Sequence, residues 1–198
     1  MDLLLATGNR DKVKEIRAKL EGLPYNVRTL DEFPGAPEVV EDRDTLEGNA
    51  VKKAIEIAQF SGQLSLADDT GLFVPAIGGE PGVFSSRYAG EDVTYADNVN
   101  KLKDRMRDVP DGERGAYFEC VIAIAYPDGV VGTASGRVDG VILREPRGKE
   151  GFGYDPLFFH EESGATFAEL SVARKNEISH RALALDRAKK VLAGLARA

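Results

Sequence analysis

The first twenty residues constrain the fold more than any other stretch of the chain. Residues 3–6 form a short apolar run without helical periodicity, which predicts one buried strand. Thr7-Gly8-Asn9 breaks this run, and across residues 11–20 apolar side chains recur at helical spacing. A strand, a tight glycine turn and a helix N-terminus together form a phosphate-binding geometry, because backbone N–H groups and the positive end of the helix dipole point at one spot.

The polar side chains of this turn have two interpretations. Thr7 and Asn9 add side-chain donors, and Lys12 lies in the first helical turn, where a cation is unfavourable unless an anion is bound nearby. Alternatively, Asn9 caps the helix and Lys12 is a solvated surface charge. The stretch lacks the G-x-x-x-x-G-K-[ST] pattern of a Walker A loop.

Composition limits the partners and the metal chemistry. The 198 residues carry a net charge of -7, which argues against nucleic acid and anionic membranes as partners. The lone Cys120 excludes an intrachain disulfide, and two histidines, His160 and His180, are too few for a usual Cys/His zinc site. We expect carboxylate ligands suited to Mg²⁺ or Mn²⁺. With no signal-like N-terminus and no run of about 18 apolar residues, we expect a cytoplasmic protein.

Helix and strand patterns alternate early in the chain, and a hairpin dominates its middle. Pro127-Asp128-Gly129 joins two β-branched and aromatic runs and is a strong hairpin signal. The whole pattern predicts an α/β fold with a mixed sheet, a single domain over residues 1–198 split into two lobes around a central cleft. The expected later strands are 25–30, 63–67, 116–126, 130–141 and 157–159, and the expected later helices are 45–60, 94–106 and 179–195.

Acidic residues that could carry chemistry follow the strand expected at 63–67. Asp68 and Asp69 lie where functional carboxylates of α/β folds are found, and adjacent strand residues point to opposite faces, so one of the pair is expected to face the site. Glu41, in the acidic loop 31–44, would complete a hard-cation site with Asp69, and one carboxylate could deprotonate a metal-bound water. Alternatively, the pair forms an Asx-type turn and Glu41 is only solvated.

Two later segments supply an aromatic ring and positive donors. The segment G-F-G-Y-D-P at 151–156 places Phe152 between glycines, which suits stacking on a nucleobase. His180 and Arg181 open the last helix, one turn after Lys175, and suit an acceptor such as a purine C6 oxygen. The alternatives are a surface turn whose rings cover the core, and a capped helix with surface charges.

Six motifs, in the same order, resemble the inosine/xanthosine triphosphate pyrophosphatase family along nearly the whole chain. Each motif alone is weak, but six in the correct order are specific. They are T-G-N-x-x-K-x-x-E at 7–15, the acidic-loop-to-helix segment 41–50, A-D-D-T-G-L at 67–72, P-G-V-F-S-S-R-Y at 81–88, G-F-G-Y-D-P at 151–156 and I-S-H-R at 178–181.

The resemblance implies a Maf/Ham1-like fold, a homodimer, and Mg²⁺-dependent hydrolysis of ITP, dITP and XTP to the monophosphate and pyrophosphate. It implies that Glu41 and Asp69 bind the metal and that Asp69 activates water. The implied substrate-binding residues are Thr7, Gly8, Asn9 and Lys12 at the triphosphate, with Thr70, and Phe152, Gly153, Tyr154, Asp155, Lys175, His180 and Arg181 toward the base.

Two departures from the family pattern concern this site. The family usually has T-F-x-E-N-A where residues 45–50 read T-L-E-G-N-A, so Glu47 is left out of the site. The family more often has Ser in place of Thr70, which keeps the hydroxyl.

Two other functions remain open at this point. One is a pyrophosphatase that prefers pyrimidine nucleotides, and the other is a nucleotide sensor without catalysis. The two carboxylates argue against a sensor, which needs no base beside a metal.

Overall fold

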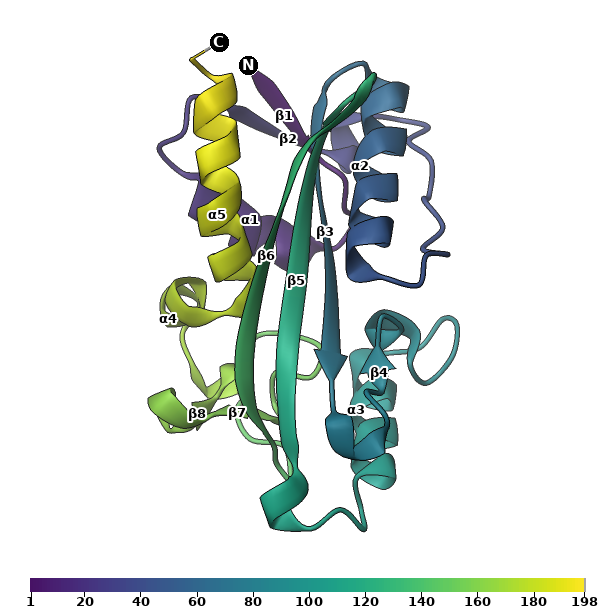
Figure 1. Ribbon diagram of the computed structural model, residues 1–198, viewed down its shortest axis with the longest axis vertical. Helices are drawn as coiled ribbons and strands as arrows, with labels where there is room; N and C mark the ends of the chain where they lie inside the picture. The colour runs from purple at the N-terminus through teal and green to yellow at the C-terminus, as the bar shows by residue number, and fades with distance from the viewer. Residues whose placement is uncertain (198) are drawn as a thin grey trace. The chain divides into compact units, whose positions relative to one another are not determined.

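The computed structural model describes residues 1–197 and has the mixed α/β architecture that the sequence predicts (Figure 1). The strand order is β2-β1-β3-β5-β6-β7-β8, with β4 paired to β3. The strands are β1 (Asp2–Leu5), β2 (Asn26–Thr29), β3 (Leu64–Phe73), β4 (Pro81–Gly82), β5 (Gly115–Tyr126), β6 (Gly129–Ile142), β7 (Phe158–His160) and β8 (Ala165–Thr166). The α-helices are α1 (Arg10–Leu20), α2 (Leu46–Ser61), α3 (Tyr95–Arg105), α4 (Val172–Ile178) and α5 (His180–Leu195).

The chain divides into two compact units. The first unit contains Met1–Asp69, Cys120–Gly136 and the chain from His180 onward. The second unit contains Thr70–Glu119 and Arg137–Ser179. Each unit has its own group of sequence-predicted site residues, so the two are described separately below.

The first unit is built on parallel strands that are covered on both faces. β1 pairs in parallel with β2 and with β3. Three consecutive leucines of β1, residues 3–5, are fully buried, as parallel strands require when both faces are packed. Alternate residues, Leu3 and Leu5 of β1 with Leu64 and Leu66 of β3, share one core with α1 and α5. Helix α2 lies on the opposite side of these strands (Figure 1).

Local capping chemistry sets the helix ends of this unit. Asn9 Oδ1 accepts hydrogen bonds from the backbone N–H groups of Asp11 and Lys12, which satisfies donors that a helix N-terminus leaves unpaired. Thr45 Oγ1 accepts from Gly48 N at the start of α2. Gly62 ends α2 in the left-handed conformation at φ 70°, where glycine carries no Cβ penalty. The predicted bounds of both helices are therefore confirmed to within about one residue.

The second unit holds an antiparallel ladder and an aromatic core. β6 pairs with β7, and β7 pairs with β8, in antiparallel register. The rings of Phe118, Phe158 and Phe167 contact one another, with centroid separations of 4.7 to 6.0 Å. Thr94 and Asp97 form a capping box at the start of α3. The predicted helix 94–106 is thereby confirmed.

The sequence prediction for β3 is too short, and the sequence pattern did not predict helix α4. The strand expected at 63–67 continues as β3 to Phe73, because β4 pairs with its far end and the Ser85 hydroxyl accepts a hydrogen bond from Leu72 N. Glycine at position 71 permits this approach, since a Cβ there would lie 2.6 Å from the Gly82 carbonyl oxygen. Ser179 is the C-cap of α4, a helix that the sequence pattern did not predict, and its N–H donates to Lys175 O.

The contact between β6 and the first turns of α5 leaves no room for a side chain at Gly136. A Cβ there would lie 2.3 Å from the His180 carbonyl oxygen and 2.5 Å from Ala184 N. We therefore expect Gly136→Ala to lower the free energy of unfolding by about 2–3 kcal/mol through overpacking, measured by urea denaturation. Gly132→Ala, on the same strand, is the control, because its Cβ would meet Val191 at an ordinary 3.5 Å. Equal stability of the two variants would contradict the close contact.

Candidate functional site

Two adjacent carboxylates on β3 face opposite sides of the first unit. Side chains of a strand alternate between its faces, so Asp68 lies on the same side as Leu64 and Leu66, which pack against α1 and α5. Asp69 lies on the other side, where Lys53 of α2 binds it. The two aspartates therefore have different hydrogen-bond partners, as expected from the alternation of side chains along a strand.

Asp68 is the centre of a buried ion cluster. Its Oδ2 accepts from Lys12 Nζ at 2.9 Å and from Arg181 Nε and Nη2 at 3.2 and 3.1 Å. Arg181 Nη1 also donates to Glu15 Oε2 at 2.5 Å. The Asp68 side chain is fully buried and that of Arg181 is 2% exposed. The cluster ties α1, β3 and α5 together through charge-assisted hydrogen bonds.

This cluster keeps Asp68 ionised. Burial alone would raise its pKa, but Lys12, Arg181 and Lys53 outweigh burial, and the pKa of Asp68 falls well below its ordinary value. Burial likewise opposes the charge of Arg181, while Asp68 and Glu15 raise its pKa. A carboxylate with so low a pKa is a poor proton acceptor, so Asp68 acts as a counter-ion.

Asp69 has a different environment, with one cation and a second carboxylate. Lys53 Nζ donates to Asp69 Oδ1 at 3.0 Å and also donates to Glu41 Oε1. Within the described part of the chain, Asp69 Oδ2 is buried and has no hydrogen-bond partner. The structure thus brings together the two sequence-predicted metal ligands, Glu41 and Asp69, on one ammonium group.

The protonation of this second group also differs. Burial raises the pKa of Asp69 to about 6, and the nearby Glu41 adds to the rise, while Lys53 and Lys12 oppose it. Burial lowers the pKa of Lys53, but Asp69 and Glu41 more than compensate, so its pKa is raised. A carboxylate with a pKa near neutrality and an oxygen without a hydrogen-bond partner is suited to accept a proton.

The turn between β1 and α1 is capped as described above, and its neighbouring cation has a partner within the chain. Thr7 Oγ1 accepts from Asn9 N at 3.2 Å, and a Cβ at Gly8 would meet nothing within 4 Å, so the turn is open beside Gly8. The position of Lys12 in the first turn does not by itself require a bound phosphate, because the Asp68 carboxylate is an anionic partner within the chain. The same holds for Arg181, whose acceptors are Asp68 and Glu15.

The second unit gathers the other predicted residues around Asp155. Its Oδ2 accepts from Phe152 N at 2.9 Å and from Lys175 Nζ at 2.5 Å. The Lys175 ammonium also lies 4.7 Å from the centroid of the Phe152 ring, which in turn contacts the ring of Tyr95. Gly151 has φ 73°, and a Cβ there would lie 2.1 Å from Asp155 Oδ2. The position of the Asp155 carboxylate therefore explains why residue 151 is a glycine.

The remaining predicted residues differ in burial. Tyr154 is buried and its hydroxyl donates to Ser85 O at 2.9 Å, which makes it an anchor of the loop. Thr70 and Gly153 are half-buried in the second unit, and Gly153 has φ 61°. His180 is buried in the first turn of α5.

Sequence reasoning assigned no role to two charged residues, Lys53 and Glu15, although Glu15 ends the motif at 7–15. Lys53 stands three residues after Ala50 and four before Ile57, inside the apolar stripe of α2, and a charge at such a position is the signal that could have found it. Glu15 is likewise buried, next to Ile16 in α1.

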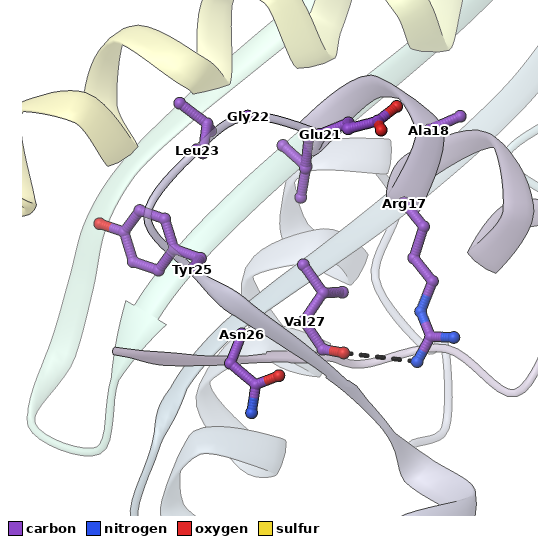
Figure 2. Close-up of a pocket in the computed structure, with 9 residues that line it drawn as sticks. Arg17, Ala18, Glu21, Gly22, Leu23, Tyr25, Asn26 and Val27 are labelled. Atoms are coloured by element: carbon purple, nitrogen blue, oxygen red, sulfur yellow. Dashed lines mark hydrogen bonds between the residues drawn. The ribbon is translucent and has the colours of Figure 1, made fainter.

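A cavity of about 390 Å³ in the first unit does not coincide with this site (Figure 2). Two of its lining residues are joined by a hydrogen bond, in which Arg17 Nη2 donates to Val27 O at 3.3 Å. None of the sequence-predicted site residues lines this cavity, which is formed by Arg17, Ala18, Leu20, Glu21, Gly22, Leu23, Tyr25, Asn26 and Val27.

Comparison with known proteins identifies the family. Residues 3–191 match the model of the Ham1 family. The chain belongs to this family. The predicted resemblance and the predicted fold class are both confirmed.

Ham1 family relatives match along almost the whole chain. The dITP/XTP pyrophosphatase of Desulforamulus reducens is 51% identical over 192 residues, covering 97% of this chain and 96% of that protein. The dITP/XTP pyrophosphatase of Bacillus subtilis is 40% identical over 191 residues, covering 96% of each chain. The structure of a HAM1 protein from Coxiella burnetii has a TM-score of 0.89 at 38% identity, covering 98% of this chain and 99% of that one.

The residues of this Ham1 family member fit a divalent metal at Glu41 and Asp69. Two carboxylates converge on one ammonium nitrogen, and Asp69 Oδ2 has no hydrogen-bond partner among the described residues. Oxygen donors of this kind suit Mg²⁺, which keeps several waters and takes phosphate oxygens as further ligands. Within residues 1–197 no group of three or more His, Cys, Asp or Glu side chains is arranged to hold a metal.

The contrast between the two aspartates predicts stability changes of opposite sign. Asp69→Asn is expected to raise the melting temperature by a few degrees at pH 8 in EDTA. The pKa of Asp69 is raised in the folded state, so its ionisation costs stability above about pH 6, and the amide removes that cost. The gain should disappear below about pH 4, where both the folded and the unfolded protein hold the protonated acid.

Asp68→Asn is expected to destabilise the protein by about 3–5 kcal/mol at pH 8, because it leaves buried cations without their counter-ion. The pKa of Asp68 is lowered in the folded state, so the carboxylate's contribution is complete above its unfolded value near 4 and declines as the pH falls further. Urea denaturation at pH 8 and at pH 3 measures both effects. Shifts of the same sign in both variants would contradict the two environments.

Proposed function

We propose that this protein hydrolyses the non-standard purine nucleoside triphosphates dITP, ITP and XTP to the monophosphate and pyrophosphate. The observation that carries the proposal is Asp69, whose pKa is raised to about 6 and whose Oδ2 is buried without a hydrogen-bond partner beside Glu41. The names of the full-length relatives, dITP/XTP pyrophosphatases, support the substrate class. The activity would remove deaminated purine nucleotides from the nucleotide pool.

The triphosphate end of the substrate suits residues of the first unit. Thr7, Gly8 and Asn9 form the open turn at the N-terminus of α1, where backbone N–H groups and the helix dipole favour anions. Lys12 adds a cation that Asp68 holds at 2.9 Å from its Oδ2. Phosphate oxygens would share this ammonium with Asp68.

Hydrolysis requires a proton acceptor and an attacking water. In the proposed reaction, Asp69 takes a proton from water as the water oxygen forms a bond to phosphorus at the α–β anhydride, and pyrophosphate leaves with the electrons of the broken P–O bond. Mg²⁺ held by Glu41 and Asp69, with Mn²⁺ as a possible substitute, would neutralise phosphate charge. Asp68 takes no part in proton transfer, because its pKa is depressed.

The purine end of the substrate suits residues that donate or stack. Phe152 offers a half-buried ring held by its backbone bond to Asp155, and Lys175 is fixed on the same carboxylate. We assign base contact to the segment 152–155, Lys175, His180 and Arg181, and assign Thr70 to the substrate as well.

No helix within residues 1–197 is long and apolar enough to cross a membrane. The proposal further places the enzyme in the cytoplasm as a homodimer, with no nucleic acid partner.

Product analysis with ITP, GTP and ATP, each in Mg²⁺ and in EDTA, tests the function directly. We expect IMP and pyrophosphate from ITP in Mg²⁺, little product from GTP or ATP, and none in EDTA. IDP and orthophosphate would contradict attack at the α–β anhydride. Faster turnover of dTTP or UTP would indicate a pyrimidine enzyme, and tight ITP binding without turnover would indicate a sensor.

Replacing the proposed base tests the mechanism separately. Asp69→Asn is expected to reduce kcat for ITP by at least about a hundredfold, because general-base catalysis of this kind contributes factors of about 10² to 10⁴. Circular dichroism and the melting temperature of the variant check that the fold survives. Glu47→Gln is the control: this exposed carboxylate accepts from the Thr133 hydroxyl and was left out of the site, so its kcat should remain normal. Near-normal turnover of the Asp69 variant would show that Asp69 is not the base.

A further inference from the structure

A buried cation of the chain lies between the two proposed metal ligands. Lys53 Nζ donates to Asp69 Oδ1 at 3.0 Å and also to Glu41 Oε1, so both carboxylates converge on one nitrogen. The Lys53 residue is 9% exposed, and the Asp69 side chain is 6% exposed. The acidic pair is thus already partly neutralised by a residue of α2.

A divalent metal would compete with this ammonium. Glu41 and Asp69 together carry two negative charges, and Lys53 offsets one of them. A metal bound through the same oxygens would compete with the ammonium for them and would lie close to its positive charge. A metal bound only through Asp69 Oδ2 would still lie beside a like charge in a poorly solvated place, where repulsion is strong.

A triphosphate changes this balance. It brings several negative charges, to which both a divalent metal and an ammonium group are attracted, and Mg²⁺ in proteins commonly takes phosphate oxygens as ligands. With the nucleotide present, the acidic pair and the phosphates can hold two cations where the acidic pair alone holds one.

We propose that Lys53 takes the place of the divalent metal at Glu41 and Asp69 in the nucleotide-free protein, and so makes metal binding depend on the triphosphate. This inference rests on the metal site of the proposed function. It assigns Lys53 as a positioning residue that suppresses metal binding without substrate and keeps Glu41, a residue of the acidic loop, beside Asp69.

The neighbouring Lys52 provides a matched control. Its Nζ donates to Val40 O and to Asp42 Oδ1, both at 2.9 Å, so it ties the same acidic loop to α2 through different acceptors. Lys52→Met therefore removes one positive charge and one tie to the loop, as Lys53→Met does. The two variants separate an effect on the metal ligands from a general effect on charge or loop position.

The experiment measures Mn²⁺ affinity by electron paramagnetic resonance of the free ion, for the wild type, Lys53→Met and Lys52→Met. Each is titrated at pH 7.5 alone and then with an ITP analogue that has a methylene bridge between its α- and β-phosphates. Without the analogue, Lys53→Met should bind Mn²⁺ at least tenfold more tightly than the wild type, and Lys52→Met should match the wild type. The analogue should raise the affinity of the wild type much more than that of Lys53→Met.

The outcomes distinguish this inference from the function on which it rests. If the wild type binds Mn²⁺ with the analogue but Lys53→Met shows no gain without it, the inference is overturned and the metal site stands. If no variant binds Mn²⁺ under either condition, the metal site of the proposed function fails. Adding Asp69→Asn to Lys53→Met should abolish the gained affinity, which places the ion at this site. Circular dichroism checks the fold, and Lys53→Gln replaces the methionine variant if that variant does not fold.

Discussion

Side chains along a β-strand alternate between its two faces, and this alternation determines which partners each charged residue of β3 meets. It turns Asp68 toward α1 and α5 and Asp69 toward α2, although the two are covalent neighbours. Each carboxylate then meets a different set of cations, and their pKa values move in opposite directions. One strand thereby supplies an ionised counter-ion on one face and, on the other, a carboxylate whose raised pKa suits it to accept a proton.

Asp68 shows how a buried carboxylate can support a neighbouring site by fixing the cations around it. Arg181 is bound by both Asp68 and Glu15, and Lys12 shares the same oxygen of Asp68. Buried ion pairs are not reliably stabilising, because desolvation offsets their attraction. Their benefit here is positional, since two cations of different helices are held in fixed places beside the turn at the start of α1.

Local chemistry made much of this fold predictable, and long-range contacts limited the rest. Short stretches of sequence encode the Asn9 and Thr45 caps, the C-cap glycine Gly62 and the hairpin before β6. The predicted bounds of those elements therefore lie close to the observed ones. The length of β3 depends on pairing with β4, which local sequence does not contain. In the site, the sequence pattern predicts that Glu41 and Asp69 come together, but not that Lys53 joins them, because the apolar periodicity of α2 does not indicate which charged side chain reaches Asp69.

The absence of a side chain at Gly136 has a consequence for how this protein can diverge. The backbone of β6 meets the backbone of α5 directly at His180 and Ala184. Because this contact joins main-chain atoms, exchanging a core side chain does not remove it, whereas any side chain at position 136 would collide with it. The backbone beside Arg181, the residue after His180, therefore owes its position to a contact that tolerates only glycine at position 136.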